Sequence, residues 1–260
     1  MKNNIVDYLA KEVKNNKINV INSFNIGGTF VSKTSGIVSG VETFIQVLEK
    51  LNRENKVFHI KDSKDLVNRG DSIVSFRSNS SDIINIIKLG ETLLSTLSSV
   101  STTMSKYLQE IKDLECDIYV FQNITSNIGE LYDAAIEDGG GKVLYTNRCY
   151  LPYLIWSNGE AGKYFENIQF DDEIYVEVHN ISEFQQALTY PCTHIVCVDF
   201  DMESIEIATS NKNNKKVGIR KNLTFANIHS YAKNNIDFVI IDNFYRNLKK
   251  YEVEFKYFEN

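Results

Sequence analysis

The chain has 260 residues, a formal net charge of −6, 43% hydrophobic and 24% charged residues. This composition is typical of a globular protein, and the length is sufficient for one large core or two smaller ones. The sequence has no run of about 18 uninterrupted apolar residues, no signal-peptide core and no basic block. We therefore expect a cytoplasmic protein that binds neither membranes nor nucleic acid. The four cysteines show no CxxC spacing, which favours buried thiols over metal ligands.

The first 112 residues mix helical and strand patterns. Helical spacing predicts helices over residues 5–13 and 41–51, and short strands are expected on either side of Gly27-Gly28 and over residues 57–60 and 73–76. Gly70 permits a turn before the last of these strands. A long helical pattern then runs from Ile83 to about Ile111, with an expected break near Gly90.

From residue 113 onward, apolar β-rich runs alternate with helical stretches. The expected strands cover residues 118–121, 142–145, 174–178, 194–198, 216–219 and 238–241, and the expected helices 128–137, 182–188, 201–209 and 224–234. Such alternation is typical of parallel βαβ units. Six or so units in ~130 residues suit a barrel smaller than the eight-unit form. The tail, residues 251–258, alternates as a half-exposed strand does and can return to the first part.

The order of these elements resembles the quinolinate and nicotinate phosphoribosyltransferases, a family also called type II. The matching segments follow the family's order: Ser35–Gly40 before a helix, Gly70-Asp71, Glu91–Ser101, Ala135 with Gly139–Gly141, Asn147-Arg148, Leu154–Asn158, Val176–Asn180 and Val198-Asp199. The resemblance implies an α+β sandwich over residues 1–112, to which strand 246–260 returns. Residues 113–245 are then an incomplete α/β barrel, usually in a dimer.

The family transfers ribose phosphate from phosphoribosyl pyrophosphate (PRPP) to the nitrogen of a pyridine acid, with Mg²⁺ on the pyrophosphate. Acidic residues hold the metal and the ribose, and basic residues hold phosphates and carboxylates. The resemblance therefore implies PRPP or a related sugar phosphate, an aromatic acid and Mg²⁺ as ligands. It also implies a homodimer or a heteromer with a paralogue.

Glu177 and Asp199 are the predicted catalytic residues and metal ligands, because they match the acidic strand ends of the family. Glu177 alternates with Val176 and Val178, so it is either functional or satisfied by a buried partner. Asp199 follows an apolar strand at its carboxyl end, where α/β proteins hold ligands. Asp201, two residues further, is equally well explained as a helix cap.

The family's basic positions are largely replaced. Gln122-Asn123 stand where the family has an Arg-Lys pair, Trp156 where it has a lysine, and Glu91 where it has an interdomain arginine. Arg220-Lys221-Asn222 replace a small Ser-Gly-Gly phosphate turn, and Asp242 replaces a second glycine. A carboxylate ~4 Å from a phosphate costs about 4 kcal/mol at an effective dielectric of ~20.

The predicted substrate- and phosphate-binding residues are Arg148, Asn123, Trp156, Asn158, Arg220, Lys221, Asn222 and Asp242. Structural alternatives exist for some of them: a surface turn for Asn147-Arg148, core packing for Trp156, which otherwise stacks on a flat ligand, and a solvated turn for Arg220-Lys221. Gly139–Gly141 is better explained by a helix-to-strand turn than by a phosphate cradle.

Three functions remain open. The chain is a phosphoribosyltransferase with an altered acceptor, a non-catalytic binding or regulatory subunit of an active paralogue, or another barrel enzyme that uses the acidic pair for Mg²⁺ on a sugar phosphate. The simultaneous loss of several basic positions favours the second, and the surviving acidic pair favours the first.

Overall fold

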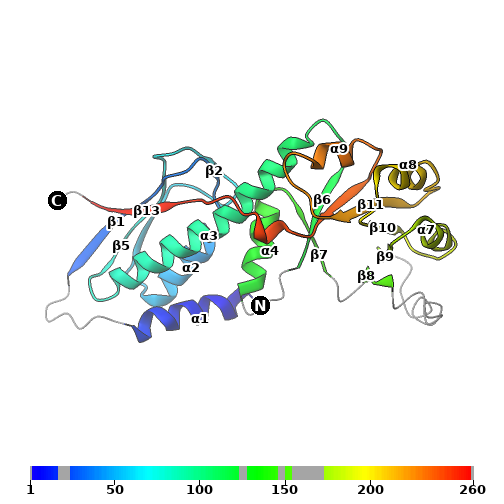
Figure 1. The fold of residues 1–260 in the computed structure, drawn as a ribbon. Coiled ribbons are helices and arrows are strands. Elements are labelled where there is room, and N and C mark those ends of the chain that lie inside the picture. The colour runs from blue at the N-terminus through cyan, green and yellow to red at the C-terminus, as the bar shows by residue number, and fades with distance from the viewer. Residues whose placement is uncertain (1, 17–23, 123–127, 146–149, 154–172, 259–260) are drawn as a thin grey trace. The chain divides into compact units, whose positions relative to one another are not determined.

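The computed structural model describes residues 2–16, 24–122, 128–145, 150–153 and 173–258 (Figure 1). The chain forms two compact units, each made of several chain segments. Unit 1 comprises Met1–Ser105, Asn123–Gly140 and Leu248–Asn260, and unit 2 comprises Lys106–Gln122 and Gly141–Asn247. Helix α4 (Gly129–Asp138) groups with unit 1, whereas its residues were expected in the barrel part, residues 113–245.

Unit 1 is built on a four-stranded antiparallel sheet with the order β13-β1-β5-β3. The strands are β1 (Asn25–Ser32), β3 (Lys56–His59), β5 (Ser72–Asn79) and β13 (Val253–Tyr257). The C-terminal tail thus pairs with β1, with Phe30 opposite Phe255. A short second sheet joins β2 (Gly36–Ile37) to β4 (Leu66–Val67).

Unit 1 also contains helices α1 (Lys2–Asn15), α2 (Val41–Leu51) and α4, and the residues of α3 (Ile83–Glu110) up to Ser105. The core of unit 1 is aromatic: Phe30 of β1 makes an edge contact with Phe44 of α2 at 5.2 Å and stacks on Phe76 of β5 at 5.8 Å between ring centroids. Such contacts add to the free energy gained from burial of the rings.

Two expectations for this unit are wrong. Gly27 and Gly28 lie inside β1 and do not separate two strands, and α3 continues through Gly90 without a break. A Cβ on Gly90 would lie 2.3 Å from Cζ of Phe30, so the glycine allows the helix to approach the sheet closely. Close packing, and not helix termination, explains this glycine. The strand expected on the N-terminal side of Gly27-Gly28, over residues 18–21, lies outside the described residues.

Polar side chains on α3 hold the C-terminal tail through its backbone. Every fourth helix residue accepts a hydrogen bond from the N–H of every second tail residue, at 2.8–3.1 Å. The pairs are Glu91 with Phe255, Ser95 with Val253, Ser99 with Tyr251 and Thr103 with Lys249. The spacing matches because four helix residues rise about 6 Å and two strand residues about 7 Å. Glu91, expected to replace an interdomain arginine, has a structural role in this ladder.

We expect Ser99→Ala to lower the free energy of unfolding by about 1–3 kcal/mol, because it leaves the Tyr251 N–H without its acceptor. The measurement is urea unfolding followed by circular dichroism. Thr92→Ala is the matched control, since Thr92 is an exposed residue of the same helix and should change stability by less than about 0.5 kcal/mol. Equal effects of the two substitutions would contradict a stabilising role for the ladder.

Helix α3 is the one helix among the described residues that is long and apolar enough to cross a membrane by length and composition alone. Its apolar side chains at Ile86, Leu94, Val100 and Met104 are fully buried. It also carries the tail ladder, and Ser98 and Thr102 accept hydrogen bonds from the backbone of Ser39 and Ile37. These contacts make α3 the core helix of unit 1.

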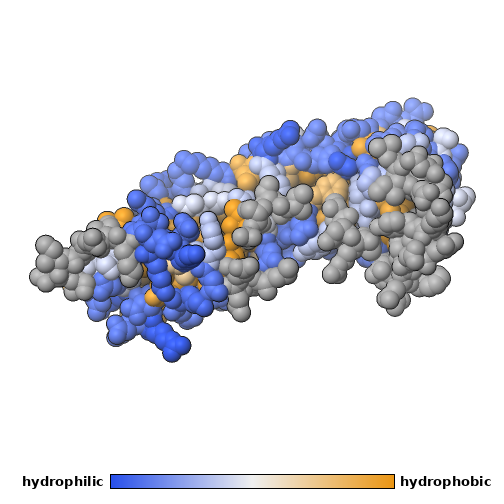
Figure 2. Space-filling view, turned by 90° about the horizontal axis from the view of Figure 1, so that it is seen from below, coloured by the Kyte–Doolittle hydropathy of each residue, from blue (hydrophilic) through white to orange (hydrophobic). Residues whose placement is uncertain are grey.

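On the face that Figure 2 shows, hydrophilic side chains predominate and hydrophobic ones occupy smaller areas.

Unit 2 contains a seven-stranded sheet in which all pairings between the described strands are parallel. The strands are β6 (Asp117–Phe121), β7 (Lys142–Leu144), β8 (Tyr150–Leu151), β9 (Tyr175–Val178), β10 (His194–Val198), β11 (Lys216–Lys221) and β12 (Phe238–Ile241). Their order, β7-β6-β12-β11-β10-β9-β8, follows the chain around a ring that β12 closes onto β6. Among the described residues no pairing joins β7 to β8. This is the incomplete α/β barrel that the sequence predicts.

Helices α7 (Ile181–Ala187), α8 (Met202–Ser210) and α9 (Ile228–Ala232) connect successive strands of this sheet, and the short 3₁₀ helix η2 (Phe244–Arg246) follows β12. Asp201 caps α8, since its carboxylate accepts the N–H of Ser204 at 2.8 Å, so the helix-cap alternative is confirmed. Strand β8 was not predicted, because two residues are too few to show an alternating pattern. Gly139 and Gly140 form the turn between α4 and β7, with φ 90° at Gly140.

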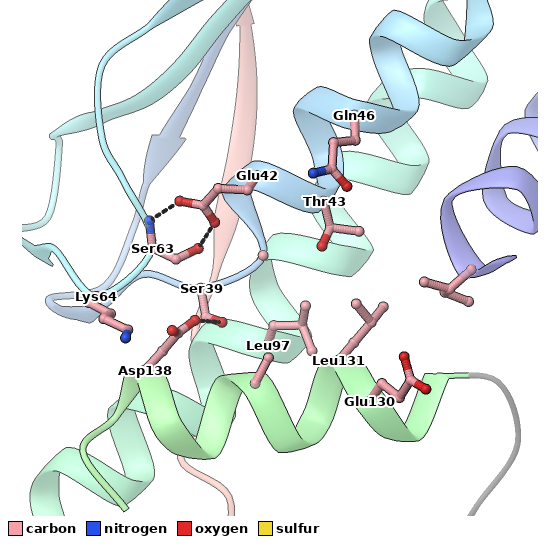
Figure 3. Close-up of a pocket in the computed structure, with 13 residues that line it drawn as sticks. Ser39, Glu42, Thr43, Gln46, Ser63, Lys64, Leu97, Glu130, Leu131 and Asp138 are labelled. Atoms are coloured by element: carbon pink, nitrogen blue, oxygen red, sulfur yellow. Dashed lines mark hydrogen bonds between the residues drawn. The ribbon is translucent and has the colours of Figure 1, made fainter. Parts of the chain in front are cut away.

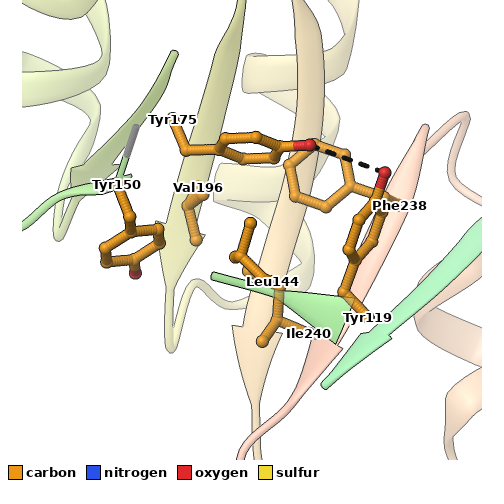
Figure 4. Close-up of a cluster of buried hydrophobic side chains, with 7 residues drawn as sticks. All are labelled: Tyr119, Leu144, Tyr150, Tyr175, Val196, Phe238 and Ile240. Carbon is orange, nitrogen blue, oxygen red and sulfur yellow. Dashed lines mark hydrogen bonds between the residues drawn. The ribbon is translucent and has the colours of Figure 1, made fainter. Parts of the chain in front are cut away.

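The interior of the barrel sheet is filled by side chains (Figure 4). The cluster consists of Tyr119, Leu144, Tyr150, Tyr175, Val196, Phe238 and Ile240, all at most 8% exposed. Strand residues alternate between the two faces, and these are the residues that face inward. Gly218 of β11 leaves room for the Phe238 ring, whose Cε2 would lie 2.2 Å from an added Cβ. The barrel interior is a packed core, as in larger barrels of this kind.

His194 is buried in this core against the Tyr175 ring at 4.2 Å, and burial lowers its pKa to about 4. The unfolded chain therefore binds a proton near pH 6.5 that the folded chain takes up only near pH 4. We expect stability to fall by up to about 3 kcal/mol as the pH drops through this window. Urea midpoints at pH 7 and 5 test this: His194→Gln should reduce the dependence and His229→Gln, at a half-exposed histidine, should not.

Candidate functional site

Charged side chains gather where the parallel strands of unit 2 end. Glu177 lies on β9, Arg220 on β11, and Asp242 directly after β12. Because parallel strands end at the same edge of their sheet, these residues lie at the carboxyl edge, which we call the barrel mouth. In α/β folds this edge holds ligands and catalytic groups.

Arg220 occupies the centre of the barrel mouth and bridges two carboxylates. Its Nη1 donates to Oε1 of Glu177 at 2.9 Å and its Nε donates to Oδ1 of Asp242 at 2.8 Å. Its guanidinium also lies over the Phe121 ring, 5.0 Å from the centroid, and Nη1 is 3.4 Å from the Tyr150 hydroxyl. A guanidinium with two carboxylates and an aromatic face is held strongly in one orientation.

This arrangement neutralises the cation within the protein itself. Burial alone would lower the pKa of Arg220, but the hydrogen bonds from Arg220 to Asp242 and Tyr150 raise it well above its ordinary value. Burial, together with the nearby Glu177 carboxylate, raises the pKa of Tyr150. Two carboxylates oppose one guanidinium, so these three residues carry an excess of one negative charge.

Glu177 is the buried member of the group, with a side chain only 9% exposed. Besides Arg220, it faces the imidazole of His179, whose Nε2 lies 3.8 Å from Oε1. The His179 ring makes an edge contact with Tyr153 at 5.6 Å. Glu177 was expected to be either functional or satisfied by a partner. Its surroundings fit the second alternative, because Arg220 supplies the counter-charge that a buried carboxylate needs.

Asp199 is exposed, in contrast to Glu177. Its side chain is 73% exposed, and its backbone has the left-handed value φ 52°, which aspartate tolerates better than most residues. Nζ of Lys221 lies 4.0 Å from Oδ1 of Asp199 and donates to the carbonyls of Asp199 and Phe200 at 3.3 Å. Lys221 also lies over the Tyr231 ring. The exposed Asp199 carboxylate and the partly buried Lys221 ammonium form a second polar feature at the end of β10.

Arg220 and Lys221 are not on a turn, which corrects the expected phosphate loop. They are the last two residues of β11, because the N–H groups of Asp199 and Asp242 continue the ladder to the carbonyls of Arg220 and Lys221. Asn222 follows as an exposed residue. Asn123, Arg148, Trp156 and Asn158 lie outside the described residues, so their predicted roles stay predictions.

Tyr150 and Phe121 were not predicted as neighbours of the charged group. Tyr150 lies on strand β8, which was not predicted. Phe121 ends an apolar run that is typical of a buried core strand. The single sequence signal was the position of each residue beside the carboxyl end of a strand.

The described residues do not form a metal site by themselves. No group of three or more His, Cys, Asp or Glu side chains among them is placed to hold an ion. Mg²⁺ usually binds one or two carboxylates together with substrate phosphates. Oε1 of Glu177 already accepts from Arg220, so Asp199 is the exposed carboxylate that fits such a role.

Comparison with solved structures identifies the fold. The chain is similar to the nicotinate-nucleotide pyrophosphorylase of Francisella tularensis, with a TM-score of 0.89 and 15% identity over 99% of this chain and 97% of that one. The enzyme of the same name from Ehrlichia chaffeensis matches with a TM-score of 0.86 and 14% identity, covering 98% of both chains. NadC from Streptococcus pyogenes matches with a TM-score of 0.85 and 16% identity over 98% and 96%.

No protein-family model matches the sequence, and a search of curated proteins finds no match. At such low identity the structural likeness establishes the fold and not the activity. The predicted fold class, an α/β sandwich with an incomplete α/β barrel of the type II phosphoribosyltransferase kind, is confirmed.

Proposed function

We propose that this chain, which has the fold of the type II phosphoribosyltransferases, does not transfer ribosyl phosphate and acts as a binding or regulatory subunit of an active paralogue. The observation that carries the proposal is the pairing of Arg220 with both Glu177 and Asp242. A phosphate ligand needs an available cation, and this one is already neutralised by the chain's own carboxylates.

The replaced basic positions support the same proposal. Gln122, Trp156 and Glu91 stand where the resemblance implies basic side chains, and Glu91 instead accepts the Phe255 N–H. Catalysis by this kind of fold relies on cations that stabilise the charge of the leaving pyrophosphate. Loss of several such cations removes that stabilisation, while the fold and its surfaces persist.

Phosphoribosyl transfer to an altered heteroaromatic acceptor is the second candidate. The exposed carboxylate of Asp199, with Lys221 beside it at the end of β10, favours it, because this pair can meet a sugar phosphate from solvent. In that case Asp199 would share Mg²⁺ with the pyrophosphate of PRPP, as hard oxygen ligands do.

Calorimetric titration and a product assay separate the two candidates. The chain alone is titrated with PRPP and Mg²⁺, and is then incubated with PRPP and either quinolinate or nicotinate while nucleotide formation is followed. We expect no nucleotide, and we expect co-purification with a paralogue that carries the intact Arg-Lys pair when the two are co-expressed.

Nucleotide formation by the chain alone would overturn the proposal. Binding of PRPP below ~100 μM that is abolished by Asp199→Asn would support the second candidate. The control is Glu206→Gln, which removes a negative charge from an exposed position of α8 in the same unit.

A further inference from the structure

A cavity in unit 1 is independent of the barrel mouth (Figure 3). It lies between α4, the start of α2 and the loop around Ser63, and has a volume of about 230 Å³. Ligand sites for drug-sized molecules measure about 300–1,000 Å³, so this cavity suits a smaller molecule. All its lining residues are described, and all belong to unit 1.

One face of α4 carries an alanine between two acidic residues, which together we call the acidic stripe. Glu130, Ala134 and Asp138 follow at intervals of four residues, which places them along one side of the helix. Eight residues rise about 12 Å, so the two carboxylates stand well apart. Figure 3 shows them near opposite ends of α4, with the apolar side chains of Leu131 and Leu97 between them.

The Asp138 end of the cavity favours positive charge. The Ser39 hydroxyl donates to Oδ2 of Asp138 at 2.6 Å. Asp138 is the last residue of α4, where the helix dipole is negative, and the last turn contains no basic residue. Burial raises the pKa of this carboxyl, although the Ser39 hydrogen bond and Lys64 act in the opposite direction.

The lining as a whole has an excess of negative charge. Glu42, Glu130 and Asp138 contribute three carboxylates and Lys64 contributes one ammonium, which leaves two negative charges. The Glu42 carboxylate accepts hydrogen bonds from the backbone N–H and the hydroxyl of Ser63. A metal ion does not fit, because the described residues contain no group of three His, Cys, Asp or Glu side chains placed to hold one, and an anion would be repelled.

We propose that this cavity binds a linear aliphatic diamine. One ammonium group would lie at Asp138 beside Ser39, the other at Glu130, and the methylene chain over Leu131 and Ala134. Two separated carboxylates joined by an apolar floor match two cationic ends joined by an apolar chain.

Calorimetry with diaminooctane tests the proposal on the full chain. We expect diaminooctane to bind at least about tenfold more tightly than octylamine, which lacks the second charge, and than putrescine, which is too short. Glu130→Gln and Asp138→Asn should each weaken diaminooctane about tenfold and leave octylamine less affected. Ala134→Leu, which keeps both charges and fills the cavity, should weaken both ligands.

Glu137→Gln is the matched control, because Glu137 is an exposed acid of α4 that does not line the cavity. Circular dichroism establishes that each variant is folded. The proposal is wrong if diaminooctane gives no heat, if all acidic variants bind it as the unaltered chain does, or if Mg²⁺ displaces it at equal concentration, since the last result describes a general acidic surface.

Discussion

Arg220→Met is expected to lower the free energy of unfolding by about 3–5 kcal/mol, the range found when one partner of a buried ion pair is removed. The substitution leaves the Glu177 carboxylate, 9% exposed, without the guanidinium that compensates its burial. It also removes the guanidinium that pairs with the Asp242 carboxylate beside it. Urea unfolding at neutral pH, followed by circular dichroism, measures the loss as a change of midpoint with an unchanged slope.

The matching rescue is a triple substitution, Arg220→Met with Glu177→Leu and Asp242→Asn. Replacement of an ion pair that contains a buried charge by apolar residues of similar size is often neutral or stabilising. Asp242→Asn removes the charge that would otherwise remain unpaired, so most of the lost stability should return. Arg246→Met, at an exposed arginine of the same unit, should change stability by less than about 0.5 kcal/mol. If the triple variant is as unstable as the single one, the charges do not explain the effect.

Asp242→Asn is expected to raise the affinity of the barrel mouth for inorganic pyrophosphate between tenfold and several hundredfold. The substitution removes the carboxylate that accepts from Nε of Arg220 and leaves the guanidinium paired with Glu177 alone. A unit charge ~4 Å from an anion is worth about 4 kcal/mol at an effective dielectric of ~20, which sets the upper limit. Calorimetric titration with pyrophosphate measures the change.

The gain should shrink as salt is added, because the interaction is between charges that solvent reaches. Glu206→Gln, which changes the net charge of unit 2 equally from an exposed site, should leave pyrophosphate binding unchanged. An equal gain in both variants would show a general charge effect. No gain with Asp242→Asn would show that Asp242 is not what prevents Arg220 from binding anions.

Much of the element order could be predicted from the sequence because its signals are local. Runs such as Ile195–Val198 and Phe238–Ile241 are apolar on both faces, as expected of parallel strands covered on both sides. The positions of Glu177 and Asp199 at strand ends could be predicted too, because the strands themselves are recognised from local patterns. The predicted helix break near Gly90 was wrong, because the sequence does not show that Phe30 lies against this glycine.

The partners of the charged residues could not be predicted. Arg220 is 43 residues from Glu177 and 22 from Asp242, and Ser39 is 99 residues from Asp138. Which side chains meet across a sheet depends on strand order and register, and a shift of one residue turns every side chain to the other face.

The sequence by itself determined a chain of βαβ units and a set of polar residues at strand ends, because hydrophobic periodicity and turn residues act over a few neighbours. Only the tertiary structure decided that Arg220 is held by Glu177 and Asp242 and that α4 presents its acidic stripe to a cavity. The physical reason is that electrostatic pairing depends on distances in space and on burial, and the folded barrel and helix packing alone set both.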